Sequence, residues 1–181
     1  MRFGVVGAGA IVAVLACEAT PQATPPVSGS PSATTTTHTE RPDAGRLEAD
    51  WNDGEVAWRP YADGIAEAAR TRKPICLVFF TTWCPHCKRY SHLFKDPRVV
   101  AAARDFVMIR VDRDLWSELS KRYSIDGEYI PRTFFLSADG RVDPAIHAER
   151  PTYAFFYDEL DPAPLLAAMV TARAAFARDG G

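Results

Sequence analysis

The stretch ICLVFFTTWCPHCK, residues 75–88, sets the architecture expected for this chain. Its first half is a run of apolar and β-favouring residues with the length of one buried strand. Two cysteines follow, Cys84 and Cys87, with two residues between them. Because residues 88–95 can continue as a helix, the stretch predicts a strand, a turn that carries the cysteines, and then a helix.

This order places Cys84 at the N-terminus of a helix, where unpaired backbone N–H groups and the helix dipole favour an anion. A thiolate there is stabilised relative to the thiol, and the thiolate is the nucleophile. Cys87 follows one turn later on the same face, so its sulfur can attack a mixed disulfide formed at Cys84. The pair predicts dithiol–disulfide exchange, with Cys84 as the exposed, attacking thiol and Cys87 as the more buried, resolving thiol.

Zinc sites also use C-x-x-C pairs, but they normally need a second pair of ligands. The other cysteines, Cys17 and Cys76, belong to no second C-x-x-C pair. We therefore expect no metal and no other cofactor at Cys84 and Cys87, with a metal site and a purely structural disulfide as minor alternatives. Cys76 lies within the predicted buried strand and is expected to be a small core residue.

Length and composition set limits on the rest of the chain. It has 181 residues, of which 47% are hydrophobic, and a formal net charge of −2. Once a leader and a linker are set aside, this is enough for one globular domain. The charge gives no reason to expect nucleic-acid binding. Four cysteines are too few for a disulfide scaffold.

Residues 1–17 are predicted to be a secretory signal. One positive residue, Arg2, precedes an apolar stretch that is short for a membrane-spanning helix and suited to a signal peptide. The segment ends in VLAC, residues 14–17, which resembles the lipobox of bacterial lipoproteins and implies lipid attachment at Cys17. An ordinary signal peptide and an uncleaved anchor are the alternatives. Each of these readings exports the domain to the bacterial cell envelope or periplasm.

Residues 18–46 are rich in Thr, Pro and Ser and include four consecutive threonines at 34–37. Such a segment lacks the apolar side chains needed to offset the entropy cost of ordering. We expect it to be a disordered tether that holds a folded domain, residues 47–181, near the membrane.

Helical and extended patterns alternate along this domain. Helices are expected after Cys84 and at residues 61–72, 97–104, 115–123 and 163–178. Strands are expected at residues 75–81, 106–111 and 132–136, and Asp139-Gly140 predicts a hairpin turn with a return strand at 141–143. This pattern indicates an α/β domain with a central mixed β-sheet flanked by helices.

The strand, the residues Trp83-Cys84-x-x-Cys87-Lys88 and the helix together resemble the thioredoxin superfamily. Across residues 51–178 the chain is similar to the small anterior-gradient and ER-resident thioredoxin-like proteins, and more distantly to the C-terminal domain of the bacterial reductase DsbD. This resemblance implies a thioredoxin-like fold and a protein thiol–disulfide oxidoreductase that needs no cofactor.

The same resemblance implies a second half of the site at Ile130-Pro131, directly before the strand at 132–136. Thioredoxin-like folds carry a cis-proline there, and cis bonds are largely confined to X-Pro sequences. The backbone of Ile130 would pair with an extended substrate chain, and Pro131 would keep the site open. An ordinary trans-proline that starts an edge strand is the alternative.

Two positions depart from thioredoxin itself. Thioredoxin has a buried aspartate six residues before its first active cysteine, and here that position is Val78. The dipeptide Pro85-His86 resembles that of the bacterial oxidase DsbA, and His86 can donate a hydrogen bond or positive charge to the Cys84 thiolate. We therefore expect a reduction potential between those of thioredoxin and DsbA, roughly −270 and −120 mV, and nearer the oxidising value. The alternative is that His86 is merely exposed.

Two neighbours complete the expected site. Trp83 is expected to pack beside the cysteines and limit access, or simply to be a core aromatic. Lys88 either adds positive potential or is a solvated lysine on the helix surface. The aromatic residues at 153–157 either floor a substrate groove or pack under the C-terminal helix, and the second is favoured.

The expected partners are cysteine-containing envelope proteins and a membrane or soluble redox partner. The direction of exchange is left open between oxidation, reduction and isomerisation. The competing functions are a redox-inert thioredoxin-like binding adaptor and a metal-delivery protein that uses Cys84 and Cys87.

Overall fold

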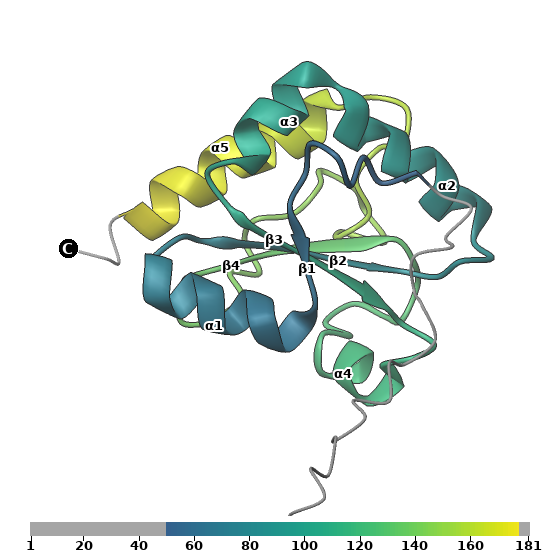
Figure 1. Cartoon of the computed structure of the whole chain (residues 1–181). Helices are drawn as coiled ribbons and strands as arrows, with labels where there is room; N and C mark the ends of the chain where they lie inside the picture. The colour runs from purple at the N-terminus through teal and green to yellow at the C-terminus, as the bar shows by residue number, and fades with distance from the viewer. Residues whose placement is uncertain (1–49, 178–181) are drawn as a thin grey trace, which may run out of the picture. The chain divides into compact units, whose positions relative to one another are not determined.

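The computed structural model describes residues 50–177, which form a sheet with helices on both faces (Figure 1). The strands are β1 (Trp58–Arg59), β2 (Ile75–Phe80), β3 (Val107–Asp112) and β4 (Arg132–Leu136). Their order across the sheet is β1-β3-β2-β4. Strand β3 pairs in parallel with β1 and β2, whereas β2 and β4 are antiparallel, so the sheet is mixed as predicted. The predicted signal, Cys17 and the tether lie outside the described residues.

The helices form the two outer layers. They are α1 (Tyr61–Thr71), α2 (Pro85–Ser91), α3 (Pro97–Ala103), α4 (Ser117–Arg122) and α5 (Ala163–Ala177), with a 3-10 turn, η1 (His92–Lys95), directly after α2. Figure 1 shows α2, α3 and α5 over one face of the sheet and α1 and α4 on the other. Within residues 50–177, no helix has the length and apolar character that a membrane crossing needs.

Strand β2 holds the two halves of the core together, because all six of its residues are buried. Successive side chains of a strand point to opposite faces. Cys76, Val78 and Phe80 join the apolar cluster beneath α2, α3 and α5. The intervening residues join the cluster that α1 and α4 cover. A strand buried on both faces is apolar throughout, which explains the unbroken run at the start of the quoted stretch.

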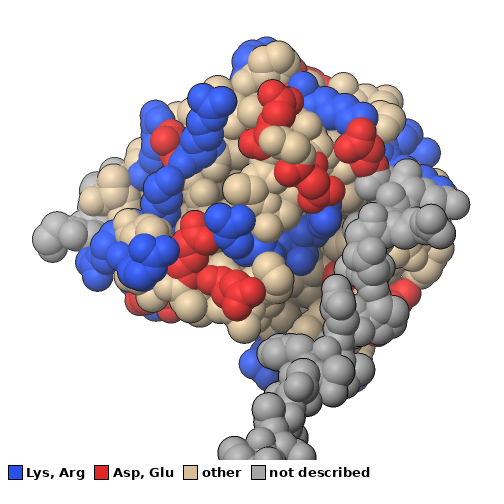
Figure 2. Space-filling view, viewed as in Figure 1, with Lys and Arg blue, Asp and Glu red and all other residues tan. Residues whose placement is uncertain are grey.

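The charged side chains do not gather by sign on the face seen in Figure 2. Lys and Arg are interspersed with Asp and Glu over its surface. This mixture accords with the small net charge of the whole sequence.

The chain after β4 differs from the sequence expectation. Asp139-Gly140 do make a turn, with Gly140 at a φ of +84°, where residues with a side chain are disfavoured. The predicted return strand at 141–143 is wrong, because only an isolated antiparallel bridge joins Leu136 to Val142. Pro144 follows at once and has no N–H to extend a ladder of hydrogen bonds.

Helix α1 approaches the sheet closely at Gly64. A Cβ atom at this position would lie 2.4 Å from Cγ1 of Ile109 in β3. We predict that Gly64→Ala lowers the free energy of unfolding by about 1–3 kcal/mol through overpacking, although alanine is the better helix former. Denaturant unfolding measures the change.

Gly54→Ala is the matched control for this substitution, because an added Cβ there meets no atom within 4 Å. Its effect should stay within about 0.5 kcal/mol. Equal effects of the two substitutions would contradict the close contact between α1 and β3.

Candidate active site

Cys84 is the N-cap residue of α2, one short turn after β2. Pro85 takes the first helical position, where its missing N–H is of no consequence. The backbone N–H of Cys87 donates a hydrogen bond to Cys84 Sγ over 3.2 Å. A sulfur anion accepts such a bond more strongly than a neutral thiol does. The start of the helix therefore favours negative charge on the Cys84 sulfur.

The cysteines of the described residues, Cys76, Cys84 and Cys87, are all free thiols. Cys76 is fully buried in β2, as expected of a core residue. The expectation that Cys84 is exposed is wrong, because only 3% of its surface is accessible, against 0% for Cys87. Both active-site candidates are packed into the apolar cluster under α2, and of the two only Cys84 keeps any accessible surface.

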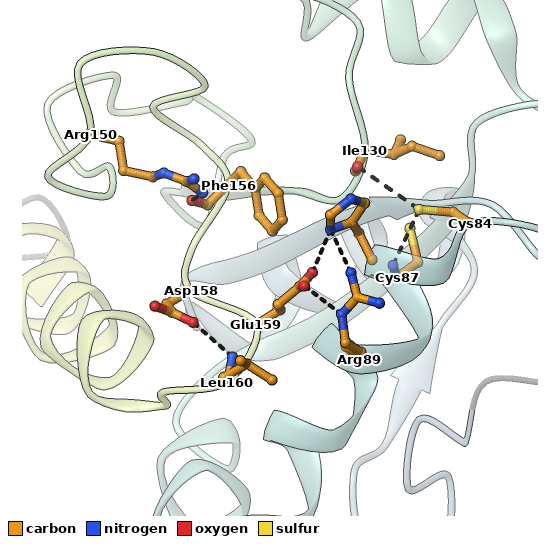
Figure 3. A network of polar contacts seen from close by, with 10 residues as sticks. Cys84, Cys87, Arg89, Ile130, Arg150, Phe156, Asp158, Glu159 and Leu160 are labelled. Atoms are coloured by element: carbon orange, nitrogen blue, oxygen red, sulfur yellow. Dashed lines mark hydrogen bonds and ion pairs between the residues drawn. The ribbon is translucent and has the colours of Figure 1, made fainter.

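The loop before β4 meets Cys84 from the other side. The Ile130–Pro131 peptide bond is cis, as the resemblance implied. The Cys84 thiol faces the carbonyl oxygen of Ile130, with an Sγ···O distance of 3.9 Å (Figure 3). Residues 46 positions apart in the sequence thus share one site.

Arg132 anchors this loop from inside the protein. The side chain is fully buried. Its Nη1 donates to the carbonyl oxygens of Tyr123 and Gly127, over 3.1 and 2.8 Å, and its Nη2 donates to the hydroxyl of Ser120. Burial lowers the pKa of Arg132, but an arginine in a protein stays charged. Arg132 directly follows Pro131. Its hydrogen bonds therefore tie the loop that holds Pro131 to α4 and to the loop that follows α4.

Apolar packing surrounds Cys87. Val78, which occupies the position of the thioredoxin aspartate, is buried in the same cluster as both cysteines. Burial, followed by the hydrogen bond with Cys84, raises the pKa of Cys87; the Thr81 backbone and the positive charge of Arg113 oppose this and are outweighed. Cys87 is therefore held as a thiol at neutral pH and must lose a proton before it can attack.

Trp83 lies on the surface beside the two cysteines. Its side chain is 61% exposed, so the alternative that it is a core aromatic is wrong. The indole Nε1 donates to Asp114 Oδ2 over 2.7 Å, and Arg113 lies over the ring at 5.9 Å. Arg113 also donates to the carbonyl oxygen of Glu128, over 3.0 Å. The segment after β3 thus braces both the cysteine turn and the loop before Ile130.

Neither Arg113 nor Asp114 was predicted from the sequence, since no motif or spacing marks them. Lys88 is half-buried in α2, and its expected electrostatic role stays a prediction.

His86 enters a network with two residues that sequence reasoning missed. Its Nδ1 lies 2.8 Å from Oε2 of Glu159 and 3.0 Å from Nη2 of Arg89. The other oxygen of Glu159 accepts from Arg89 Nε over 2.5 Å (Figure 3). Arg89 stands three residues after His86, a helical spacing that the sequence does contain. Glu159 lies 73 residues from His86, and no local pattern points to it.

A cavity of about 960 Å³ opens beside this network. His86 and Phe156 line it together with residues 145–150 and the start of α5. Tyr157 instead is fully buried in the cluster that contains α5 side chains. The aromatic residues at 153–157 therefore have different environments. Tyr157 packs in the cluster under the C-terminal helix, as favoured, whereas Phe156 lines the cavity beside His86.

The comparisons with known proteins accord with this geometry. Residues 57–138 match the model of a protein family described as thioredoxin-like. The solved structure of a thioredoxin from Thermus thermophilus superposes with a TM-score of 0.51 at 20% identity, over 68% of this chain and 92% of that one. The described residues therefore have a thioredoxin-like fold, with a mixed sheet flanked by helices.

Two named relatives resemble this domain in sequence. The human anterior gradient protein 2 homolog is 24% identical over 121 residues, which cover 66% of this chain and 67% of that protein. The thiol:disulfide interchange protein DsbD of Ralstonia nicotianae is 34% identical over 87 residues, or 45% of this chain. The match covers only 14% of DsbD, so it concerns one segment of that protein. Of the two relatives, DsbD is the one whose name states thiol:disulfide interchange.

The environment of Cys87 predicts how its reactivity depends on pH. In a Cys84→Ser variant, alkylation of Cys87 by iodoacetamide should rise about tenfold per pH unit between pH 7 and 9 without a plateau. The reason is that the raised pKa leaves only a small thiolate fraction, which grows as the pH rises towards it. Mass spectrometry of timed samples gives the rates.

A Cys87→Ser variant is the matched control, and its Cys84 should react at least about tenfold faster at pH 7 because of the hydrogen bond at the helix start. A plateau for Cys87 below pH 8 would contradict the account.

Proposed function

We propose that this chain is an exported thiol–disulfide oxidoreductase that exchanges disulfides with cysteines of envelope proteins through the sequence Cys84-Pro85-His86-Cys87. The observation that carries the proposal is the position of the Cys84 sulfur. It accepts the Cys87 N–H at the start of α2 and faces the carbonyl oxygen of Ile130. Disulfide exchange needs a nucleophilic sulfur, a resolving thiol and a backbone segment that can pair with a substrate chain.

The exchange would proceed in two displacements. The Cys84 thiolate attacks one sulfur of a substrate disulfide; a Cys84–substrate disulfide forms, and the other substrate sulfur leaves as a thiolate that takes a proton from water. Cys87 then gives up its proton and attacks Cys84 Sγ, which forms the Cys84–Cys87 disulfide and releases the second substrate thiolate. The substrate gains two electrons and the domain loses two. The reverse sequence oxidises a substrate dithiol.

Each neighbouring residue has a part in these steps. The burial of Cys87 keeps it protonated until the mixed disulfide brings the two sulfurs into reaction, so the resolving thiol does not compete with Cys84 for substrate. The carbonyl oxygen of Ile130 can pair with an extended substrate backbone, as a strand edge does. Val78 offers no carboxylate to accept the Cys87 proton, which favours slower reduction of substrates than thioredoxin achieves.

Trapping of mixed disulfides tests this proposal. With Cys87→Ala in the full chain, resolution is blocked, so Cys84 should retain partner proteins as adducts that a reducing agent releases. The full chain is expressed in a bacterium that exports it, and the adducts are resolved on non-reducing gels and identified by mass spectrometry. The exported chain should capture proteins of the envelope.

Two matched variants act as controls. The variant with Cys87→Ala and Cys84→Ala should retain none of the adducts, whereas the variant with Cys87→Ala and Cys76→Ala should retain all of them. Adducts that persist without Cys84 would contradict the proposed nucleophile. If Cys84→Ser with Cys87→Ser kept full biological activity, the redox-inert adaptor would replace the oxidoreductase.

The export signal and the lipid anchor are proposed from the sequence of residues 1–17. We expect labelled palmitate to be incorporated at Cys17 when the full chain is produced in a bacterium. Cys17→Ala should abolish the label and release the domain from the membrane fraction. Equal labelling of the two chains would exclude Cys17 as the site of attachment.

A further inference from the structure

Glu159 lies in the segment before α5 and contacts helix α2. Its carboxylate uses both oxygens on α2: Oε1 accepts from Arg89 Nε and Oε2 lies 2.8 Å from His86 Nδ1. Its side chain is only 15% exposed, against 54% for His86 and 44% for Arg89. This partial burial keeps solvent from fully screening the two ion pairs, as it would for exposed ones.

Two partners of opposite charge meet the same nitrogen of the imidazole. Oε2 of Glu159, which can accept a hydrogen bond, lies 2.8 Å from His86 Nδ1. Arg89 Nη2, which can only donate, lies 3.0 Å from the same Nδ1. Because Glu159 also accepts from Arg89 Nε, its carboxylate holds the His86 ring in place and offsets the charge of Arg89 at once.

The segment that carries Glu159 is itself braced. Asp158 accepts the backbone N–H of Leu160 over 2.8 Å, and Arg150 donates to the carbonyl oxygen of Phe156 over 2.9 Å (Figure 3). The ring of Phe156 meets the His86 imidazole edge-to-face at 5.7 Å. These contacts hold the chain on both sides of Glu159, so that its carboxylate faces α2.

Charge near Cys84 bears directly on redox poise. The reduced site can carry a thiolate, whereas the disulfide is neutral, so positive charge nearby stabilises the reduced form and makes the disulfide more oxidising. Glu159 engages two side chains of α2: Arg89, which is a cation, and His86, whose ring carries charge only when it is protonated. Building on the proposed disulfide exchange, we infer that Glu159 is a positioning residue that restrains the oxidising power of the Cys84–Cys87 pair by holding these two side chains.

Reduction potentials of full-length variants test the inference. Glu159→Gln keeps the shape of the side chain but loses its charge, and we expect the equilibrium constant with glutathione to shift about three- to tenfold toward the reduced domain, or about 15–30 mV more oxidising. Arg89→Gln should shift the constant in the opposite direction. The double variant should return to within about twofold of the wild type, because the net charge is restored.

Asp158→Asn is the matched control. It removes one negative charge next to Glu159 in the sequence, but the Asp158 carboxylate bonds to the backbone N–H of Leu160 in its own segment and not to α2. It should shift the constant by less than about twofold. The ring 15N resonances of His86 give an independent readout: they should shift in Glu159→Gln, which alters the Nδ1 contact, and stay as in the wild type in Asp158→Asn. Circular dichroism confirms that each variant is folded, and Arg89→Gln alone tests the inference if Glu159→Gln unfolds.

Equal shifts in Glu159→Gln and Asp158→Asn, or no shift in Glu159→Gln and Arg89→Gln, would overturn the inference. If the wild type equilibrates with glutathione while the variants are unchanged, the inference alone fails. If the wild type never forms the Cys84–Cys87 disulfide, the proposed function fails together with it.

Discussion

The hydrogen bond from the Cys87 N–H to the Cys84 sulfur is the interaction on which the rest of this structure depends. It exists because β2 delivers the chain to the start of α2, with Cys84 as the N-cap and Pro85 in the first turn. Burial of β2 on both faces leaves that strand little freedom to shift. The Cys84 sulfur is therefore placed by a strand that is buried along its whole length.

Burial and reactivity are balanced at this site. Cys84 has almost no exposed surface, yet it lies at the start of a helix and beside the Ile130 carbonyl, where an approaching disulfide can align with it. Cys87 is sealed in apolar packing, and burial raises its pKa. Under the proposed exchange, Cys84 is the attacking thiol and Cys87 stays protonated until the mixed disulfide has formed, although only two residues separate them.

The sequence predicted the parts of the fold that local chemistry determines. An unbroken apolar run and a C-x-x-C pair are each visible within a few residues, and they correctly placed β2 and α2. The cis bond at Pro131 was implied by the resemblance to thioredoxin-like folds, and the structure confirms it. The prediction of a return strand was wrong because only one residue pair, Leu136 with Val142, forms a bridge there, and a single pair does not make a ladder. The prediction that Cys84 is exposed was wrong because its burial depends on contact with a loop that lies 46 residues away in the sequence.

The network around His86 shows the same limit. Arg89 could be reached from helical spacing, but Glu159 arrives from a segment whose position is set only when α5 packs on the sheet. The sequence-based view of His86 as a donor to Cys84 stays a prediction, while its Nδ1 is engaged by Glu159 and Arg89. Long-range contacts of this kind carry no local signal in a single sequence.

The most direct test of the central claim is redox equilibration of the purified wild-type chain with glutathione, followed by peptide mapping of the oxidised form. The account predicts one disulfide between Cys84 and Cys87, a free Cys76, and a potential between roughly −270 and −120 mV. A potential at or below that of thioredoxin, or a disulfide that involves Cys76, would contradict it.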